Sequence, residues 1–179
     1  MPNPPHQPPP FLTEHTILGA MRGRDCQLSD VTLIRLPVAE ATALGEAFAA
    51  IDPWASYPYP ASGLAAYFSQ GDNSAPVFAV QIAEATVGVV GLRLNWLRGP
   101  YLQFLGFLPE HQSLGLGSLV LDWIETQTRR AGHSNVFVAA SDFNEAALRF
   151  YERHGFERAG LLKGLVREDR DEILLHKKL

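Results

Sequence analysis

The sequence of 179 residues predicts a mixed α/β fold: one central sheet of about seven strands, mixed but mostly antiparallel, flanked by helices. Three observations indicate this fold class. Segments with strand and helix periodicity follow one another in the order strand, two helices, three strands, helix, strand, helix, two strands. The composition, 46% hydrophobic and 19% charged, is typical of a globular protein. The length suits a single domain with a sizeable core.

The beginning of the chain differs from the rest in composition. Six of the first ten residues are proline, which excludes a helix or an inner strand there. We therefore expect residues 1–28 to form a flexible proline-rich tail and residues 29–179 to form the folded domain. The first strand is expected at 30–36, a β-branched run that stops at Pro37.

The remaining elements follow from the spacing of apolar residues and from the turn residues between them. Helical spacing predicts helices at 41–51 and 64–68, and turn chemistry follows at 71–74. The other expected elements are strands at 77–82, 86–94 and 101–108, a helix from 117 to 131, a strand at 136–140, a helix that begins at Asn144, and strands at 156–166 and 171–177.

An anion-binding turn is predicted where the strand 101–108 passes into the next helix, at Gln112-Ser113-Leu114-Gly115-Leu116-Gly117. The first amides of a helix lack an acceptor within the helix, and the positive end of its dipole lies there. Glycine at 115 and 117 lets the backbone approach a phosphate closely. No Lys or Arg occurs between Gly106 and Glu125, so backbone amides have to hold the anion. A tight turn that packs a helix onto a sheet is an alternative explanation.

A second motif runs from Asn144 to Phe156, with the sequence Asn-Glu-Ala-Ala-Leu-Arg-Phe-Tyr-Glu-Arg-His-Gly-Phe. Asn144 can cap the start of a helix and Gly155 can end it. Asn144 and Tyr151 are two turns apart and lie on one side of that helix. The two motifs, in this order and at this separation, resemble those of the GNAT superfamily of acyl-CoA-dependent N-acetyltransferases: Gln/Arg-x-x-Gly-x-Gly/Ala, then Asn-x-x-Ala-x-x-Phe-Tyr-x-x-x-Gly-Phe.

The resemblance implies the GNAT fold, acetyl-CoA as cosubstrate, and acetyl transfer to a primary amine of a small molecule or peptide by direct attack in a ternary complex. It implies Tyr151 as the proton donor to the leaving thiolate and the Leu105 backbone amide as the donor to the oxyanion. Leu114 departs from the family, which often has a basic or small residue there. Acetyl-CoA binding is implied for Phe107, Gln112, Ser113, Leu114, Gly115, Leu116, Gly117, Ser118, Asn144 and Tyr151.

The general base is open at this stage. Several members of the family carry a glutamate on the strand before the loop, where this chain has Tyr101, with Gln103 and Leu105 expected on the same strand face. None of these three side chains takes a proton near neutral pH. Glu84 and His133 are unpaired candidates elsewhere in the sequence. A water relay and an acceptor that is already largely deprotonated are further alternatives.

The acceptor amine is open as well. The aromatic, proline-rich segment 53–60 is too irregular for a helix or strand, and in the family this region forms a wall of the acceptor site. Its aromatic residues either line that pocket or seal the loop against the sheet. On the Asn144 helix, Phe150 is expected to pack into the core while Tyr151, about 100° further round, faces the cofactor.

Composition and charge limit the partners. A formal net charge of -4 gives no basic surface for nucleic acid. No apolar run is long enough to span a bilayer and the N-terminus lacks a signal-peptide pattern, so no membrane partner and a cytoplasmic location are expected. Cys26, the only cysteine, cannot form an intrachain disulfide, and no cluster of Cys or His predicts a metal site. A homodimer is left open.

Two other functions compete with acetyl transfer. A Rossmann dinucleotide-binding unit would also have Gly115-x-Gly117 before a helix and an acid such as Asp142 after the next strand. Against it, Val120 stands where the third glycine belongs. A non-catalytic acyl-CoA sensor or interaction module with the same fold is favoured by the missing glutamate. It is disfavoured by Tyr151, which sensing does not need.

Overall fold

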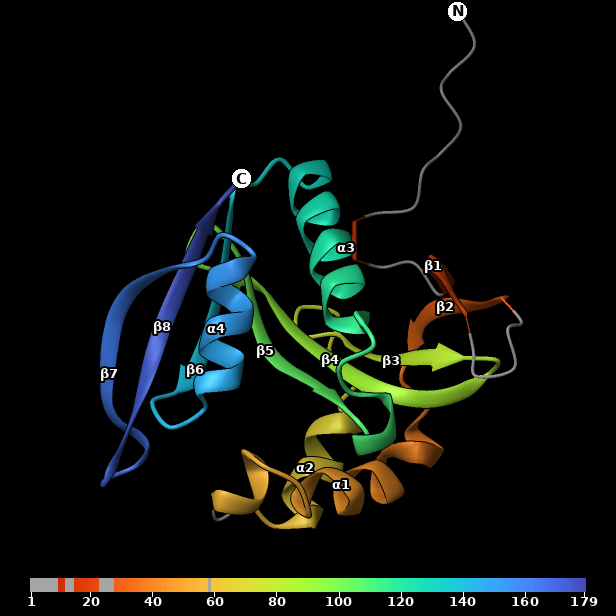
Figure 1. The fold of residues 1–179 in the computed structure, drawn as a ribbon, viewed down its shortest axis with the longest axis horizontal. Helices are drawn as coiled ribbons and strands as arrows, with labels where there is room; N and C mark the ends of the chain where they lie inside the picture. The colour runs from red at the N-terminus through yellow and green to blue at the C-terminus, as the bar shows by residue number, and fades with distance from the viewer. Residues whose placement is uncertain (1–9, 12–14, 23–27, 58) are drawn as a thin grey trace, which may run out of the picture.

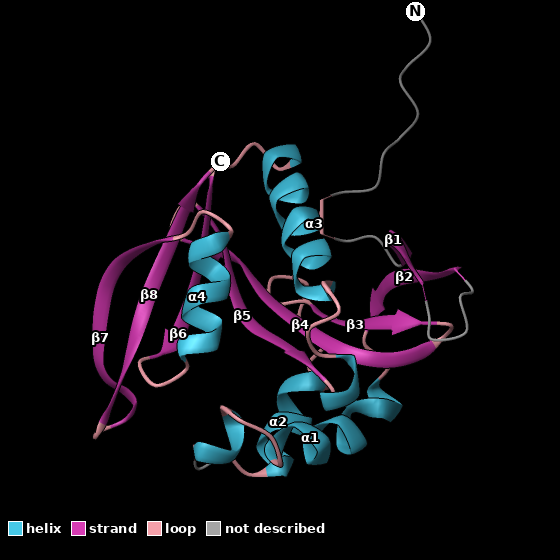
Figure 2. Ribbon diagram, viewed as in Figure 1, coloured by secondary structure: helices cyan, strands magenta, loops and turns pink. Residues whose placement is uncertain are grey.

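The computed structural model describes residues 10–11, 15–22, 28–57 and 59–179, and within them one eight-stranded sheet carries helices on both faces (Figures 1 and 2). The strand order is β1-β2-β3-β4-β5-β6-β8-β7. This architecture confirms the predicted mixed, mostly antiparallel sheet with flanking helices.

The strands are β1 (His15–Arg22), β2 (Leu28–Arg35), β3 (Val77–Ile82), β4 (Ala85–Trp96), β5 (Gly99–Phe107), β6 (Asn135–Ser141), β7 (Glu157–Arg167) and β8 (Arg170–Lys178). The helices are α1 (Ala41–Ala49), α2 (Ala61–Phe68), α3 (Leu116–Arg130) and α4 (Glu145–Arg153), with short 3-10 turns η1 (Val38–Glu40), η2 (Trp54–Ser56) and η3 (Pro109–His111).

The sheet begins earlier in the chain than the sequence predicts. β1 pairs antiparallel with β2 along most of its length, so the expectation of a tail over residues 1–28 is wrong for residues 15–22. Gly19 and Ala20 fall within β1, and because both residue types are depleted in strands, the segment lacks a clear strand pattern. Residues 1–9, which hold most of the prolines of that segment, lie outside the described residues.

Each face of the sheet is covered by its own pair of helices. On β3, Phe78 and Val80 pack into one core with α3 and α4, whereas Val77 and Ala79 pack on the opposite face into a second core with α1 and α2. This period of two is the pattern of a strand that is buried on both faces. Among the described residues, no helix is long and apolar enough to cross a membrane.

The sheet opens between β5 and β6, the one parallel pair among the strand pairs of the described residues. The two strands pair only at Tyr101–Phe137 and Leu102–Val138. Beyond these residues β5 stays with β4 and β6 stays with β8, and Figure 1 shows β5 and β6 separating. One parallel pair is incompatible with a doubly wound parallel sheet, so the Rossmann alternative is wrong.

A bulge in β5 changes which residues share a face. Leu102 and Phe104 lie opposite adjacent residues of β4, so Gln103 is an extra residue between them. After the bulge, Phe104 packs with α1 and α2, and Leu105 packs against the core that contains α3. The expectation that Tyr101, Gln103 and Leu105 lie on one face is therefore wrong, because the extra residue shifts the alternation by one.

Helices α1 and α2 pack closely, and this contact fixes the loop between them. A Cβ added at Gly45 would lie 2.6 Å from the Ala61 carbonyl oxygen and 2.8 Å from the Ala65 nitrogen. Both of these are backbone atoms of α2, which cannot move aside as the end of a flexible side chain can. Gly45 is thus required by the approach of the two helices, which hold segment 53–60 between them.

Replacing Gly45 with Ala is expected to lower the free energy of unfolding by about 1–3 kcal/mol through overpacking, despite the better helix propensity of alanine. Gly63→Ala in α2 is the matched control, because its added Cβ meets only two ring carbons of Pro60, at 3.3 and 3.5 Å. Urea unfolding of both variants measures the difference. Equal stability of the parent and the Gly45 variant would contradict the close helix contact.

Candidate functional site

The turn before α3 presents a row of unused backbone donors. Gly115 is the N-cap of α3, with a φ of 81°, and its carbonyl accepts from the N–H groups of Ser118 at 3.1 Å and Leu119 at 3.3 Å. Ser113 also has a positive φ, 61°. Within the described residues, the consecutive N–H groups from 113 to 117 have no hydrogen-bond acceptor. Such a row at a helix N-terminus binds anions, phosphate in particular.

The two glycines of this turn have different roles. A Cβ at Gly115 would meet no heavy atom within 4 Å, so this position needs glycine for its positive φ and leaves the donors accessible. A Cβ at Gly117 would lie 2.9 Å from Cζ of Phe150. Gly117 therefore makes room for α4, a packing role that the sequence analysis missed. Beside them, Leu114 is exposed and Leu116 anchors the turn in the core.

The open edge of β5 offers further backbone groups. The N–H of Leu108 donates to the carbonyl of Val87 at 2.9 Å, which fixes the alternation of hydrogen bonds between β4 and β5. By this alternation, the N–H and C=O groups of Leu105 and Phe107 point away from β4. The side chain of Gln112 donates to the Phe107 carbonyl at 3.0 Å, so the turn before α3 is tied to this edge.

A cleft of about 430 Å³ lies where β5 and β6 diverge. Leu105 of the predicted strand and both Asn144 and Tyr151 of the second motif line it. Pro53, Trp54, Tyr57 and Tyr59 of the aromatic segment line it as well, and Trp54 stacks on Phe104 of β5 with ring centroids 4.4 Å apart. The aromatic residues of this segment thus both line the cleft and pack onto the sheet.

A buried polar cluster that sequence reasoning missed completes the cleft. The hydroxyl of Tyr57 donates to a carboxylate oxygen of Glu172, and it lies 2.8 Å from the hydroxyl oxygen of Ser141. Since Tyr57 has one proton and an ionised carboxylate only accepts, the Ser141 hydroxyl donates to Tyr57. Burial, and then the bond to Glu172, raises the pKa of Tyr57 to about 12. Glu172 is 7% exposed and lines the cleft.

Comparison with known proteins agrees with this geometry. The model of the acetyltransferase (GNAT) family matches residues 41–156. The chain belongs to this family. A GNAT-family structure from Desulfovibrio desulfuricans has 19% identity and a TM-score of 0.69, over 83% of this chain and 98% of that one. The ribosomal-protein-S18-alanine N-acetyltransferase of Escherichia coli has 18% identity and a TM-score of 0.66, over 83% and 93%.

A GNAT acetyltransferase from Elizabethkingia anophelis, solved with acetyl-CoA bound, has 14% identity and a TM-score of 0.56, over 59% of this chain and 77% of that one. At these identities the solved structures establish the shared fold. The family and this bound ligand support acetyl-CoA as the cosubstrate. The free amides of 113–117 fit its pyrophosphate, and the open edge at Leu105 and Phe107 fits its amide-containing arm.

Tyr151 is more buried than the GNAT motif suggests. It is 6% exposed, packs in the core between Phe150 and Phe156, and lines the cleft. Burial raises the pKa of Tyr151, so its hydroxyl stays protonated at neutral pH. Phe150, expected in the core, is instead half-buried over Gly117 because α4 presents the neighbouring Tyr151 inward.

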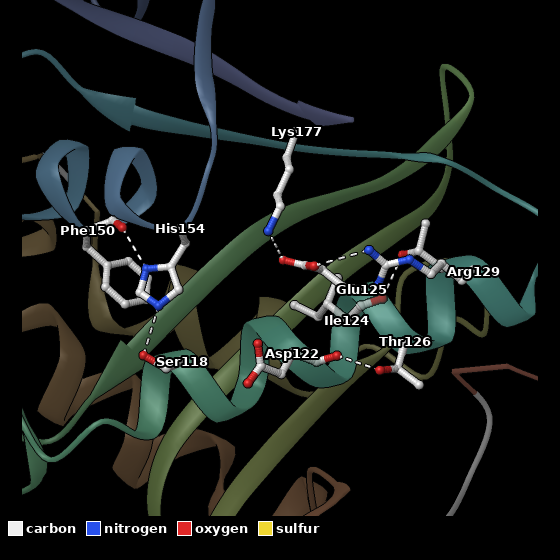
Figure 3. Close-up of polar contacts among 10 residues, drawn as sticks. Ser118, Asp122, Ile124, Glu125, Thr126, Arg129, Phe150, His154 and Lys177 are labelled. Atoms are coloured by element: carbon white, nitrogen blue, oxygen red, sulfur yellow. Dashed lines mark hydrogen bonds and ion pairs between the residues drawn. The ribbon is translucent and has the colours of Figure 1, made fainter. Parts of the chain in front are cut away.

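Two predicted cofactor residues, Asn144 and Ser118, already have partners within the chain. The Asn144 side-chain oxygen accepts from the Ala147 N–H at 3.1 Å and caps α4. The Ser118 hydroxyl lies 2.9 Å from Nε2 of His154 (Figure 3). The His154 Nδ1–H donates to the Phe150 carbonyl at 2.8 Å, so in this tautomer Nε2 accepts from Ser118. Neither the N–H nor the hydroxyl proton of Ser118 is left for a phosphate.

The position of α3 is fixed by charged contacts as well. Figure 3 shows Glu125 on α3 between Lys177 of β8 and Arg129 one turn along the helix. Glu125 is nearly buried, and its ion pair with Lys177 joins α3 to the half of the sheet beyond the opening. The turn before α3 is thus held in place relative to both halves.

The candidate bases named from the sequence lie elsewhere. Glu84 has a positive φ in the turn between β3 and β4, and His133 follows the end of α3. Neither residue lines the cleft between β5 and β6. Nothing in the linear sequence separates Glu172 from Glu168 or Asp171, because its position depends on β8 lying beside β6.

Replacing Gly115 with Ala is expected to weaken CoA binding by about tenfold or more, or ~1.4 kcal/mol, because the new Cβ enters the open space before the free amides. Gly132→Ala is the matched control: Gly132 also has a positive φ, 75°, and no atom within 4 Å of an added Cβ, but it follows the end of α3. Both variants lose similar stability, roughly 1–2 kcal/mol. Calorimetric titration with CoA that found equal affinities in both would reject the phosphate site.

Replacing Ser118 with Ala is expected to leave CoA affinity within about twofold of the parent, since the donors of Ser118 are already used. Loss of the hydrogen bond to His154 lowers the free energy of unfolding by about 1 kcal/mol. The same CoA titration and a urea melt test both parts. A tenfold loss of affinity would return Ser118 to the phosphate site.

Proposed function

We propose that the protein is an N-acetyltransferase that moves an acetyl group from acetyl-CoA to a primary amine of a small molecule or peptide, by direct attack in a ternary complex. The observation that carries this proposal is the single cleft that joins the Leu105 edge and Tyr151 to a separate wall of aromatic residues. A thioester and an amine can be held there together, which direct transfer requires.

The backbone groups supply binding and electrostatic stabilisation. The N–H groups of 113–117 hold the pyrophosphate, and the open edge of β5 holds the pantetheine arm. The Leu105 N–H, which points away from β4, donates to the oxygen that becomes negative when the amine attacks the thioester carbonyl. A preorganised backbone donor of this kind typically contributes about 10²–10³ in rate.

Tyr151 supplies the proton for the leaving thiolate. Its raised pKa keeps the proton on the hydroxyl until the sulfur acquires charge. Among the described residues, the Tyr151 hydroxyl has no hydrogen-bond partner that would compete for that proton. This hydroxyl would have no task in a non-catalytic acyl-CoA sensor. The main argument for a sensor, the lack of a base, is weakened because Glu172 lies in the cleft.

Replacing Tyr151 with Phe is expected to lower kcat about 10²-fold, while acetyl-CoA affinity and thermal stability stay close to those of the parent. The hydroxyl acts mainly in the transition state, so the substrate complex is little affected. Thiol release from acetyl-CoA with a panel of primary amines, with products identified by mass spectrometry, tests both the activity and the variant. A parent protein that binds acetyl-CoA but acetylates no amine would be the sensor instead.

A further inference from the structure

We propose that Glu172 binds the ammonium group of the acceptor and takes its proton, and that the acceptor is a primary ammonium ion attached to an uncharged, apolar group. The proposal rests on the acetyl transfer proposed above and adds to it a residue and a substrate class. Its basis is a buried carboxylate that faces the cleft without a cationic partner.

The charge of Glu172 is not neutralised by the fold. Within the described part of the chain, no Lys, Arg or His forms an ion pair with it. Glu125, which is buried to a similar degree, has both Lys177 and Arg129 as partners. An unpaired buried carboxylate is unfavourable unless a ligand pairs with it, and such groups gather at functional sites.

Among the described residues that line the cleft, Glu172 is the only carboxylate. The other titratable lining groups are tyrosines, and burial raises the pKa of each of them: Tyr57, Tyr59, Tyr67, Tyr101 and Tyr151. No Lys, Arg or His of the described chain lines the cleft, so the carboxylate of Glu172 has no cationic neighbour there. A carboxylate or phosphate beside the amine would therefore be repelled.

The surroundings of Glu172 orient its carboxylate and select what accompanies the ammonium group. Tyr57 donates to one carboxylate oxygen, and Ser141, directly opposite Glu172 in the ladder of β6 and β8, holds Tyr57 in place. The rings of Tyr57 and Tyr59 meet edge to face at 5.9 Å, and tyrosine faces attract a cation. The apolar wall of Trp54 and Phe104 suits an apolar substituent.

The protons balance across the reaction. The ammonium ion gives one proton to the Glu172 carboxylate, and the neutral amine attacks the thioester carbon. As the carbon–sulfur bond breaks, the sulfur takes a proton from Tyr151 and the nitrogen loses its second proton, which restores Tyr151. Glu172 then releases its proton to solvent, so one proton leaves for each amide formed.

Glu172→Gln is expected to lower kcat/KM for phenethylamine roughly 10²-fold at neutral pH. The KM for acetyl-CoA stays unchanged, because its site is formed by other groups. The loss shrinks as pH rises towards the pKa of the amine, since the neutral amine then arrives without the help of Glu172. The titratable groups facing Glu172 are Tyr57, Tyr59 and Tyr101, with Asp142 near Tyr57, and none of them reproduces this recovery.

Two further variants make the test specific. Asp171→Asn changes the neighbouring carboxylate of β8, which accepts from the Gly164 N–H outside the cleft, and is expected to keep the parental activity. Tyr57→Phe removes the donor that orients Glu172 and is expected to lower kcat about tenfold without changing the KM for acetyl-CoA.

The substrate class is tested on the parent protein, so it is decided even if the Glu172 variant fails to fold. Phenethylamine and phenylalaninamide are expected to be acetylated with similar kcat/KM, and phenylalanine, which adds a carboxylate, at least about tenfold more slowly. Equal rates with phenylalanine would overturn the substrate class.

A Glu172→Gln variant with the parental pH profile would overturn the role of Glu172 while acetyl transfer stands. Acetyl-CoA binding without acetylation of any amine would refute acetyl transfer itself.

Discussion

The site depends on the divergence of β5 from β6. Each of these strands is paired along its outer edge, β5 with β4 and β6 with β8, so each half of the sheet is complete without the other. Their inner edges pair at only two residue positions and then carry backbone groups that neither strand satisfies. Unpaired backbone groups are unfavourable when buried, and a ligand with amide and carbonyl groups of its own can satisfy them. The way the sheet is built therefore favours ligand binding at the opening, as proposed above.

In the proposed complex, helix α3 sets where the phosphates of acetyl-CoA lie relative to this opening. The turn before it is tied to the end of β5 through Gln112. The body of the helix is held against α4 by Ser118 and against β8 by Glu125 (Figure 3). These contacts reach both halves of the sheet, so the free amides of 113–117 keep a fixed place beyond the open edge of β5. The missing Cβ of Gly117 lets Phe150 of α4 approach this turn.

The order of strands and helices was predictable because each element has its own local pattern of apolar residues and is bounded by turn residues. The turn before α3 and the helix that contains Tyr151 were predictable for the same reason, and both lie where the motifs place them. β1 was missed because Gly19 and Ala20 break its pattern, and the face of Leu105 was missed because a bulge leaves no local signal. Glu172 was missed because its place depends on the register between β6 and β8, a long-range pairing.

One half of the cleft is formed by backbone groups and the other by side chains from distant parts of the chain. This difference explains why the sequence indicates the cosubstrate but not the acceptor. The half proposed for acetyl-CoA uses backbone amides, and the glycine-containing turn and the bulged strand set their positions whatever side chains they carry. The opposite half uses the side chains of Tyr57, Ser141 and Glu172. Ser141 lies 84 residues after Tyr57 in the chain, and Glu172 lies 115 residues after it. The hydrogen bonds that orient the carboxylate also hold the segment 53–60 against β6 and β8. A substitution that changes the charge of this half also loosens its wall, so acceptor choice and the shape of the cleft are coupled.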